Sequence, residues 1–203
     1  MIWLLLVPSY FLGTFPSAVM VARSKGVDIH TVGSGNPGAS NIARTFGTKW
    51  GVFVFVLDGL KGAIPVAVSL LVVDQRPAAL SYAMAGAAVL GHMFPVTRHF
   101  RGGKGVATVG GAIVALQPLL FVALTAVWVV VRKATGKASL ASLLVAIGFP
   151  IGMVALDRPA WEVGAAAALA AVVLLRHLDN IKRLVSGREL SASQQVTANE
   201  ASD

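Results

Sequence analysis

Cysteine is absent from this chain of 203 residues, and acidic residues are scarce, at 9. The first absence excludes disulfides and thiolate chemistry but leaves the redox compartment open. The few carboxylates show no metal-ligand spacing with histidine, and no pair of them is placed for general acid–base catalysis. Charged residues of both signs make up only 13% of the chain, roughly half the share of a soluble domain. The sequence therefore predicts no metal site and disfavours metal-dependent phosphoryl transfer.

Long apolar runs fill most of the chain. Hydrophobic residues make up 56% of it, and the mean hydropathy is +0.74. A helix needs about 20 predominantly apolar residues to cross a bilayer. Six apolar stretches are present: 1–22, 50–73, 77–98, 105–131, 138–156 and 163–175. All but 163–175 approach or exceed that length, and only 50–73 contains an internal charged pair, Asp58 and Lys61. The pattern predicts an all-α integral membrane protein.

The run 105–131 is unusual because of its length. As one helix its 27 residues would extend about 40 Å, more than the hydrocarbon core requires. Gln117 and Pro118 lie near its centre, and proline interrupts the hydrogen bonding of a helix. We therefore expect two short helices near 105–131, folded as a hairpin.

Loop charges decide between a hairpin and a single crossing. With a hairpin and an outside N-terminus, four loop regions share one side: 23–49, 98–104, 132–137 and 176 to the end. They hold 14 of the 17 basic residues. The positive-inside rule then predicts seven transmembrane helices, with the N-terminus outside and the C-terminus inside. Cytoplasmic loop charge also explains the net charge of +8 without nucleic acid.

The domain organisation is simple. We expect one membrane domain over 1–189. Residues 190–203 are polar and rich in serine and glutamine, which predicts a disordered cytoplasmic tail.

A first polar motif, Gly33-Ser-Gly-Asn-Pro-Gly-Ala-Ser-Asn41, follows the first apolar run and precedes Arg44. Glycine lets successive amides point into one concavity, which binds anions such as phosphate. Hydroxyl and amide donors in the motif, and the guanidinium of Arg44, suit the same ligand. The alternative is an ordinary polar connecting loop. The donors that we assign to the anion site are Ser34, Gly35, Asn36, Gly38, Ser40, Asn41 and Arg44.

A second motif, Arg101-Gly-Gly-Lys-Gly105, precedes an apolar run. It lacks the spacing of a nucleotide-binding P-loop. Gly102, Gly103 and Lys104 nevertheless suit an anion held at a helix N-terminus. Anchoring by positive charge on the cytoplasmic side is the alternative, although it does not require three glycines. The predicted topology places both motifs on one side, which indicates a phosphorylated substrate.

Three further groups of polar residues are candidates. Asp58 and Lys61 can pair within a helix, either as a structural ion pair or as part of a site. His177, Asn180 and Arg183 share one helical face, where histidine could deprotonate a hydroxyl and asparagine could stabilise an oxyanion. That segment reads equally well as an amphipathic helix on anionic lipid. The third group is Ser139 with Ser142, on the same predicted side.

Taken together, five ordered motifs resemble the bacterial acyl-phosphate:glycerol-3-phosphate acyltransferases. They are Gly33–Arg44, Asp58–Gly62, Gly91–Thr108, Ser139–Ser142 and Arg176–Glu189. The resemblance implies a seven-helix enzyme of the bacterial inner membrane with a cytoplasmic active site. It implies transfer of a fatty acyl group from acyl phosphate to the 1-hydroxyl of sn-glycerol 3-phosphate, giving lysophosphatidic acid and inorganic phosphate. No cofactor, metal or obligatory protein partner is implied beyond membrane lipids.

The resemblance also implies roles for individual residues. Arg44, Lys104 and Ser142 would bind the phosphate of glycerol 3-phosphate. His177 and Asn180 would orient the attacking hydroxyl and stabilise the carbonyl charge, with either a substrate phosphate or His177 accepting the proton. The remaining expected substrate-binding residues are Ser34, Gly35, Asn36, Gly38, Ser40, Asn41, Lys61, Gly102, Gly103, Ser139 and Arg183.

Overall fold

The apolar runs fold into helices, and all regular secondary structure within the described residues, 1–73 and 79–191, is helical. The structure is a computed structural model. Of the predicted tail, only Leu190 and Ser191 are among the described residues. The elements are η1 (Ile2–Leu5), α1 (Leu6–Gly13), α2 (Ser17–Arg23), α3 (Ala39–Phe46), α4 (Thr48–Val72), α5 (Ala79–Met93), η2 (Val96–Arg98), α6 (Val106–Leu116), α7 (Pro118–Thr135), α8 (Ala138–Ala155), α9 (Ala160–Arg176) and α10 (Leu178–Val185).

Within the described residues, five helical stretches are long and apolar enough to cross a membrane. They are Ile2–Arg23, Thr48–Val72, Ala79–Arg98, Pro118–Thr135 and Ala138–Ala155. The pair α9 and α10, bent by 60°, would make a sixth. Helix α6 is shorter, since its 11 residues extend about 16 Å. The all-α membrane class is confirmed, whereas the count of seven and the orientation stay predictions.

The predicted break at Gln117 and Pro118 is confirmed. Gln117 leaves the helical conformation, and Pro118 is the first residue of α7. Proline is tolerated there because a first-turn N–H has no partner within the helix. The expectation of two short helices is wrong for α7, which has 18 residues and ends at Thr135. Charged residues do not stop a helix, and α7 continues until Gly136 caps it with a left-handed backbone.

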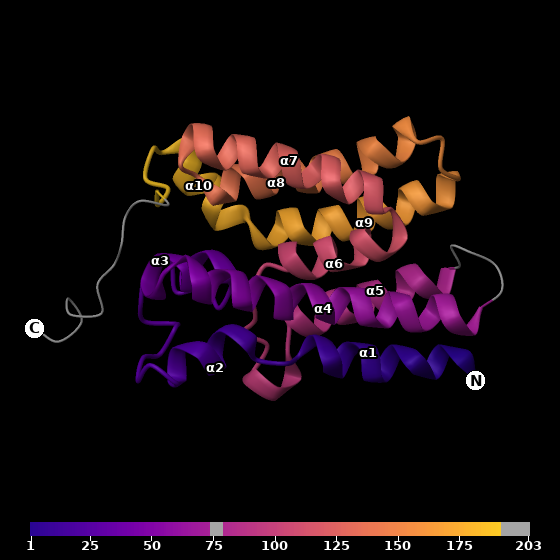
Figure 1. The fold of residues 1–203 in the computed structure, drawn as a ribbon, viewed down its shortest axis with the longest axis horizontal. Coiled ribbons are helices and arrows are strands. Elements are labelled where there is room, and N and C mark those ends of the chain that lie inside the picture. Colours follow the sequence, from indigo (N-terminus) through magenta and orange to yellow (C-terminus); the bar gives the residue numbers. More distant parts are fainter. Residues whose placement is uncertain (74–78, 192–203) are drawn as a thin grey trace, which may run out of the picture.

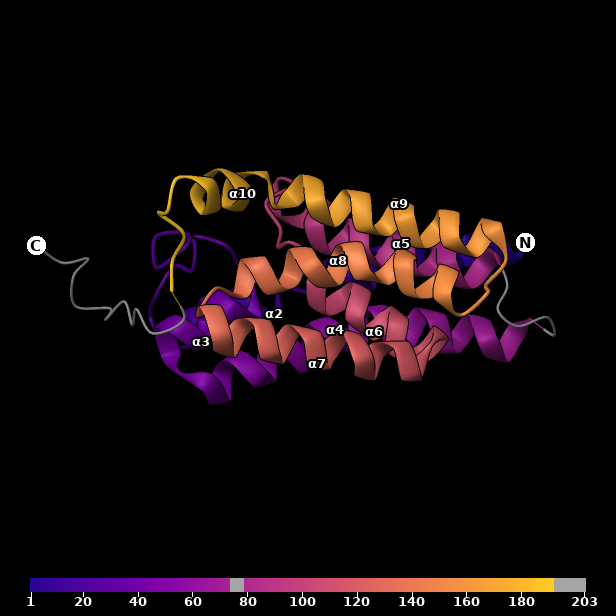
Figure 2. The same ribbon diagram turned by 90° about the horizontal axis from the view of Figure 1, so that it is seen from above.

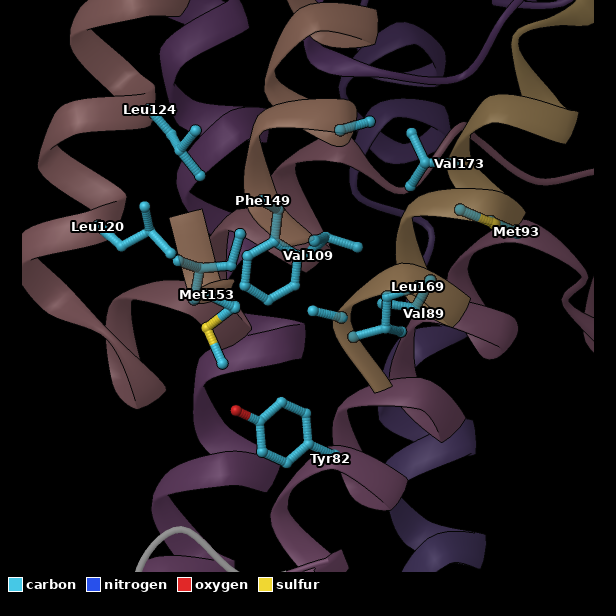
Figure 3. Close-up of a cluster of buried hydrophobic side chains, with 13 residues drawn as sticks. Tyr82, Val89, Met93, Val109, Leu120, Leu124, Phe149, Met153, Leu169 and Val173 are labelled. Carbon is cyan, nitrogen blue, oxygen red and sulfur yellow. The ribbon is translucent and has the colours of Figure 1, made fainter. Parts of the chain in front are cut away.

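The helices form two layers with α6 between them. Helices α1 to α5 lie in one layer and α7 to α10 in the other (Figure 1). The view from above shows the long helices running roughly parallel (Figure 2). Side chains of α5, α6, α7, α8 and α9 form one apolar core. It contains Tyr82, Val89, Phe149, Met153 and Leu169, among others (Figure 3). The short helix α6 thereby fills the centre of the molecule and connects the layers.

Helices α4 and α6 approach until their backbones touch. A Cβ atom on Gly62 would overlap the carbonyl oxygen of Thr108, and one on Gly111 would overlap that of Gly59. Small residues permit this distance between membrane helices. The close approach brings the start of α6, and the loop before it, beside the middle of α4.

Candidate active site

The first polar motif is a loop held by one buried side chain, Asn41. Its Oδ1 accepts a hydrogen bond from the Ser34 amide at 2.9 Å, and its Nδ2 donates to the Val32 carbonyl at 3.0 Å. Gly33 has φ of 58° and touches Asn41, so the loop needs glycine there. Asn41 therefore shapes the loop that carries Ser34 and Asn36.

The second polar motif packs against the end of α5. The Gly103 amide donates to the His92 carbonyl at 3.2 Å. A Cβ on Gly102 would overlap that same carbonyl, and one on Gly103 would overlap the His92 ring. Close packing thus explains both glycines, and the Gly103 amide is already engaged.

Arg176 holds this loop from the other layer. Its guanidinium donates to the Gly102 carbonyl at 2.9 Å and to the Gly103 carbonyl at 3.3 Å. The same guanidinium lies over the Phe94 ring at 5.2 Å. Arg176 therefore fixes the backbone that presents Lys104. From the sequence alone, Arg176 had no assigned role beyond its place at the start of the fifth motif.

Lys61 belongs to a buried cluster beside this loop. Its Nζ donates to Asp58 Oδ1 at 2.6 Å, and His92 Nδ1 lies 3.4 Å from Nζ and 3.7 Å from the carboxylate. Asp58 and His92 reach the wall of the adjoining cavity, whereas Lys61 is not among its lining residues. The pair forms as its spacing predicted, and the position of Lys61 favours the structural interpretation.

His177 lies where α9 ends and is 3% exposed. Its Nδ1 lies 2.8 Å from the Val173 carbonyl oxygen. A carbonyl can only accept, so a neutral ring carries its proton on Nδ1. Nε2 is then left with its lone pair and can accept a hydrogen bond from a substrate hydroxyl.

Lys104 and Asn180 form the centre of a polar chain. Lys104 Nζ donates to Asn180 Oδ1, and Asn180 Nδ2 donates to Glu189 at 2.6 Å. Arg183 Nε donates to the other carboxylate oxygen at 2.8 Å. Burial lowers the pKa of Lys104 to about 8, and the charge of Arg183 adds to the shift. The structure thus brings these predicted residues together, although Arg183 reaches the site only through Glu189.

Glu189 is the last residue of the fifth motif, and no role was assigned to it from the sequence. Burial opposes its ionisation, but contacts with Ser139, Asn180 and Arg183 outweigh that effect and hold its pKa below the usual value. Its carboxylate is therefore charged at neutral pH. It lies among cations that would otherwise face one another.

Arg44, on α3, is a further cation beside these polar groups. It is 9% exposed, and its Nε donates to the Ser191 carbonyl at 3.3 Å. Burial lowers its pKa, Arg132 lowers it further, and Glu189 opposes both. Arginine nevertheless stays protonated in proteins. The buried cation is suited to hold an anion.

These elements enclose a cavity of about 370 Å³. Of the predicted residues, its lining includes Ser34, Asn36, Gly38, Ser40, Asn41, Arg44, Lys104, Ser139, Ser142, His177 and Asn180. Gly35, Lys61, Gly102, Gly103 and Arg183 lie outside the lining. Four of the five motifs therefore supply several wall residues, and the Asp58–Gly62 motif supplies one, Asp58.

The rest of the cavity is apolar. Its wall there comes from the α4, α6, α7 and α8 side chains, including Phe55, Ile113, Phe121, Leu124 and Phe149. Cations and hydroxyls at one end and aliphatic and aromatic groups at the other suit an amphiphile with an anionic head. The sequence did not reveal this apolar part, because lipid-facing and cavity-facing side chains have the same composition in a membrane helix.

Comparison with known proteins agrees with this geometry. The family model described as glycerol-3-phosphate acyltransferase matches residues 3–187. A glycerol-3-phosphate acyltransferase of Solidesulfovibrio magneticus is 42% identical, over 92% of each chain. One of Aquifex aeolicus is 38% identical, over 91% of this chain and 96% of its own.

A solved structure shares the fold. The crystal structure of PlsY, an integral membrane glycerol 3-phosphate acyltransferase in its glycerol 3-phosphate form, superposes with a TM-score of 0.89. It is 36% identical, and the match covers 94% of each chain. Its lysophosphatidic acid form superposes with a TM-score of 0.87. The chain belongs to the glycerol-3-phosphate acyltransferase family.

Proposed function

We propose that this protein transfers a fatty acyl group from acyl phosphate to the 1-hydroxyl of sn-glycerol 3-phosphate, releasing lysophosphatidic acid and inorganic phosphate. The observation that carries the proposal is a cavity on which separate motifs converge. Its cationic end suits two phosphate groups, and its apolar end suits a fatty acyl chain. The glycerol 3-phosphate and lysophosphatidic acid forms of the related enzyme support the same substrate and product.

The phosphate of glycerol 3-phosphate binds to Arg44 of α3 and to Lys104 in the loop before α6, and both residues line the cavity. Charge-assisted hydrogen bonds from a guanidinium and an ammonium suit a phosphate dianion. The loop over Ser34, Asn36 and Ser40 offers hydroxyl and amide donors to the acyl phosphate. Each substrate phosphate thus has its own set of donors within the polar part of the cavity.

In the reaction the glycerol 1-hydroxyl attacks the acyl carbonyl. The new carbon–oxygen ester bond forms, and the carbon–oxygen bond to phosphate breaks. Acyl phosphate is an activated mixed anhydride, so the leaving phosphate needs little protonation and can itself take the hydroxyl proton. Before the attack the hydroxyl donates its one hydrogen bond to His177 Nε2, which orients it. As the ester bond forms, the proton passes through His177 Nε2 to the leaving phosphate, and Asn180 stabilises the charge on the carbonyl oxygen.

Asn180 must exchange a partner to act in this way, because its Nδ2 donates to Glu189 in the structure. Catalytic hydrogen bonds commonly tighten only when substrate is bound. Binding of a phosphate dianion to Arg44 and Lys104 would compete with Glu189 for these cations and release the amide. The variants His177→Ala and Asn180→Ala are each expected to lose turnover at saturating substrate.

We further propose that the site faces the cytoplasm of a bacterial inner membrane. The basic loops at 23–49, 132–137 and 176–188 lie at the end of the helix bundle that carries α3 and α10, whereas the loop between α5 and α6 lies nearer its middle (Figure 1). The positive-inside rule assigns that end to the cytoplasm.

The test is product formation by purified protein in detergent. Glycerol 3-phosphate is offered with palmitoyl phosphate, palmitoyl-CoA or palmitoyl acyl carrier protein. We expect lysophosphatidic acid from palmitoyl phosphate alone. Product from a thioester alone would contradict the proposed donor. Phosphate flux in sealed vesicles without acyl transfer would show a transporter instead.

A further inference from the structure

Arg132 is a cation of the cavity wall that has no role in the mechanism above. It lies in the last turn of α7 and lines the cavity. Its Nε is buried and has no hydrogen-bond partner among the described residues, and none of the carboxylates described lies within 4.0 Å of its guanidinium. A buried guanidinium donor without an acceptor is unfavourable. The cost is removed when an anion occupies the cavity.

A neighbouring tryptophan fixes the direction of Arg132. Its guanidinium carbon lies 5.3 Å from the centre of the Trp128 ring, one helical turn earlier. Trp128 Nε1 in turn donates to Ser142 Oγ at 3.1 Å. The interaction of a cation with the ring face orients the guanidinium and leaves its edge free to donate.

Ser142 is occupied by this arrangement. Its hydroxyl donates to the Ala138 carbonyl at 2.9 Å while it accepts the bond from Trp128. A hydroxyl has one proton to give, so Ser142 does not donate to a ligand in this state. Ser142 instead holds the Trp128 ring in place, and that ring positions Arg132.

Arg132 also lies near a second cation, Arg44. The charge of Arg132 contributes to the lowered pKa of Arg44, after burial as the main cause. The two side chains come from different helices, α7 and α3, and both line the cavity. Two like charges held near each other in a cavity favour an anion between them.

We propose that Arg132 is a phosphate-binding residue of this site, positioned by Trp128 and Ser142 and acting together with Arg44. This inference rests on the proposed function, since it takes the phosphate to be that of a substrate. The ligand group is a phosphate monoester or an acyl phosphate, and the kinetics below distinguish glycerol 3-phosphate from the donor.

The first test is the Arg132→Ala variant. A charge-assisted hydrogen bond lost from a ligand raises its KM by roughly tenfold to a hundredfold. A rise in the KM of glycerol 3-phosphate assigns Arg132 to the acceptor, and a rise in the KM of acyl phosphate assigns it to the donor. Arg132→Lys keeps the charge without the planar fork and should give a smaller rise. If both KM values stay within about twofold of the unmodified protein, the proposal is wrong.

The second test concerns the positioning residues. Trp128→Leu removes the ring and should raise the same KM as Arg132→Ala, with kcat little changed. Trp128→Phe keeps a ring under the guanidinium and should recover part of the affinity. A Trp128→Leu variant that lowers kcat while leaving both KM values unchanged would contradict a positioning role.

A binding measurement separates this inference from the proposed function. Inorganic phosphate and glycerol 3-phosphate are each added to purified protein in detergent, and the thermal unfolding midpoint is followed. We expect each ligand to raise the midpoint, and Arg132→Ala to lose that protection while unfolding normally without ligand. Lys133→Ala is the matched control, because this neighbouring side chain is exposed and outside the cavity lining.

The outcomes are distinguishable. Protection that depends on Arg132, without acyl transfer from any donor, would refute the proposed function and keep the phosphate site. Acyl transfer with full protection in Arg132→Ala would keep the function and refute the role of Arg132.

Discussion

Burial lowers the pKa of Lys104 so far that its charge changes near pH 8. Its pKa is lowered to about 8 by burial and by the charge of Arg183. The ammonium is therefore present below that pH and is lost as the pH rises through it. The substrate phosphate is already a dianion above its second pKa of about 6. We expect kcat/KM for glycerol 3-phosphate to fall above about pH 8, since this parameter reports the free enzyme.

The matched control for that prediction is Lys104→Arg. Arginine stays charged to much higher pH, so the fall above pH 8 should disappear even if the variant is less active overall. Initial rates are measured from pH 6.5 to 9.5 at constant ionic strength. A profile that is the same in both proteins would assign the fall to another group.

The Asp58–Lys61 pair is the second charge effect at the scale of residues. Both side chains are almost fully buried, and the Nζ to Oδ1 distance is 2.6 Å. Removing one partner leaves the other charge buried without compensation, which costs about 3–5 kcal/mol. Lys61→Met should lower the thermal unfolding midpoint strongly. The double variant Asp58→Asn, Lys61→Met should recover much of the loss, and failure to do so would refute the account of a coupled pair.

The crossing of α4 and α6 carries a prediction at the scale of elements. Gly111 on α6 touches the backbone of Gly59, so an added methyl group must force the helices apart. Overpacking of this kind costs about 1–3 kcal/mol. Gly111→Ala should therefore lower the unfolding midpoint. Gly86→Ala on α5 is the control, because an added Cβ there meets no atom beyond its chain neighbours and its own helix backbone within 4 Å, and it should leave the midpoint unchanged or slightly raised.

The sequence predicted elements well where a local signal marks their ends. Pro118 marked the break between α6 and α7. The end of α7 was instead predicted too early, because Gly136, and not the charge of Arg132, ends the helix. The need for glycine where two helices cross could not be predicted from the sequence, because no local signal marks such a position. Gly62 appeared only as part of a motif, and its requirement arises from Thr108, a residue 46 positions later in the chain. Contacts between distant residues leave no periodic pattern.

At the scale of the whole molecule, the polar site was predictable as a set of residues more than as a set of roles. Ser34, Arg44, Lys104 and His177 line one cavity as expected. The glycines of the second motif instead pack against α5, and Arg176 and Glu189 hold partners that no sequence spacing indicates. The charge pattern predicted a side of the membrane. Only folding decides which charged groups face each other.

The orientation of the molecule gives the last prediction. The chain has no cysteine, so single cysteines can be introduced without a reactive background. Lys133 and Ala160 are both exposed and lie at opposite ends of the helix bundle, near the end of α7 and the start of α9. In intact cells a membrane-impermeant maleimide should label the Ala160→Cys variant and should label Lys133→Cys only after permeabilisation. This result follows from the positive-inside rule, because 14 of the 17 basic residues belong to loops assigned to the inside. Labelling of Lys133→Cys from outside would reverse the orientation and place the phosphate-binding cavity on the side away from the cytoplasm.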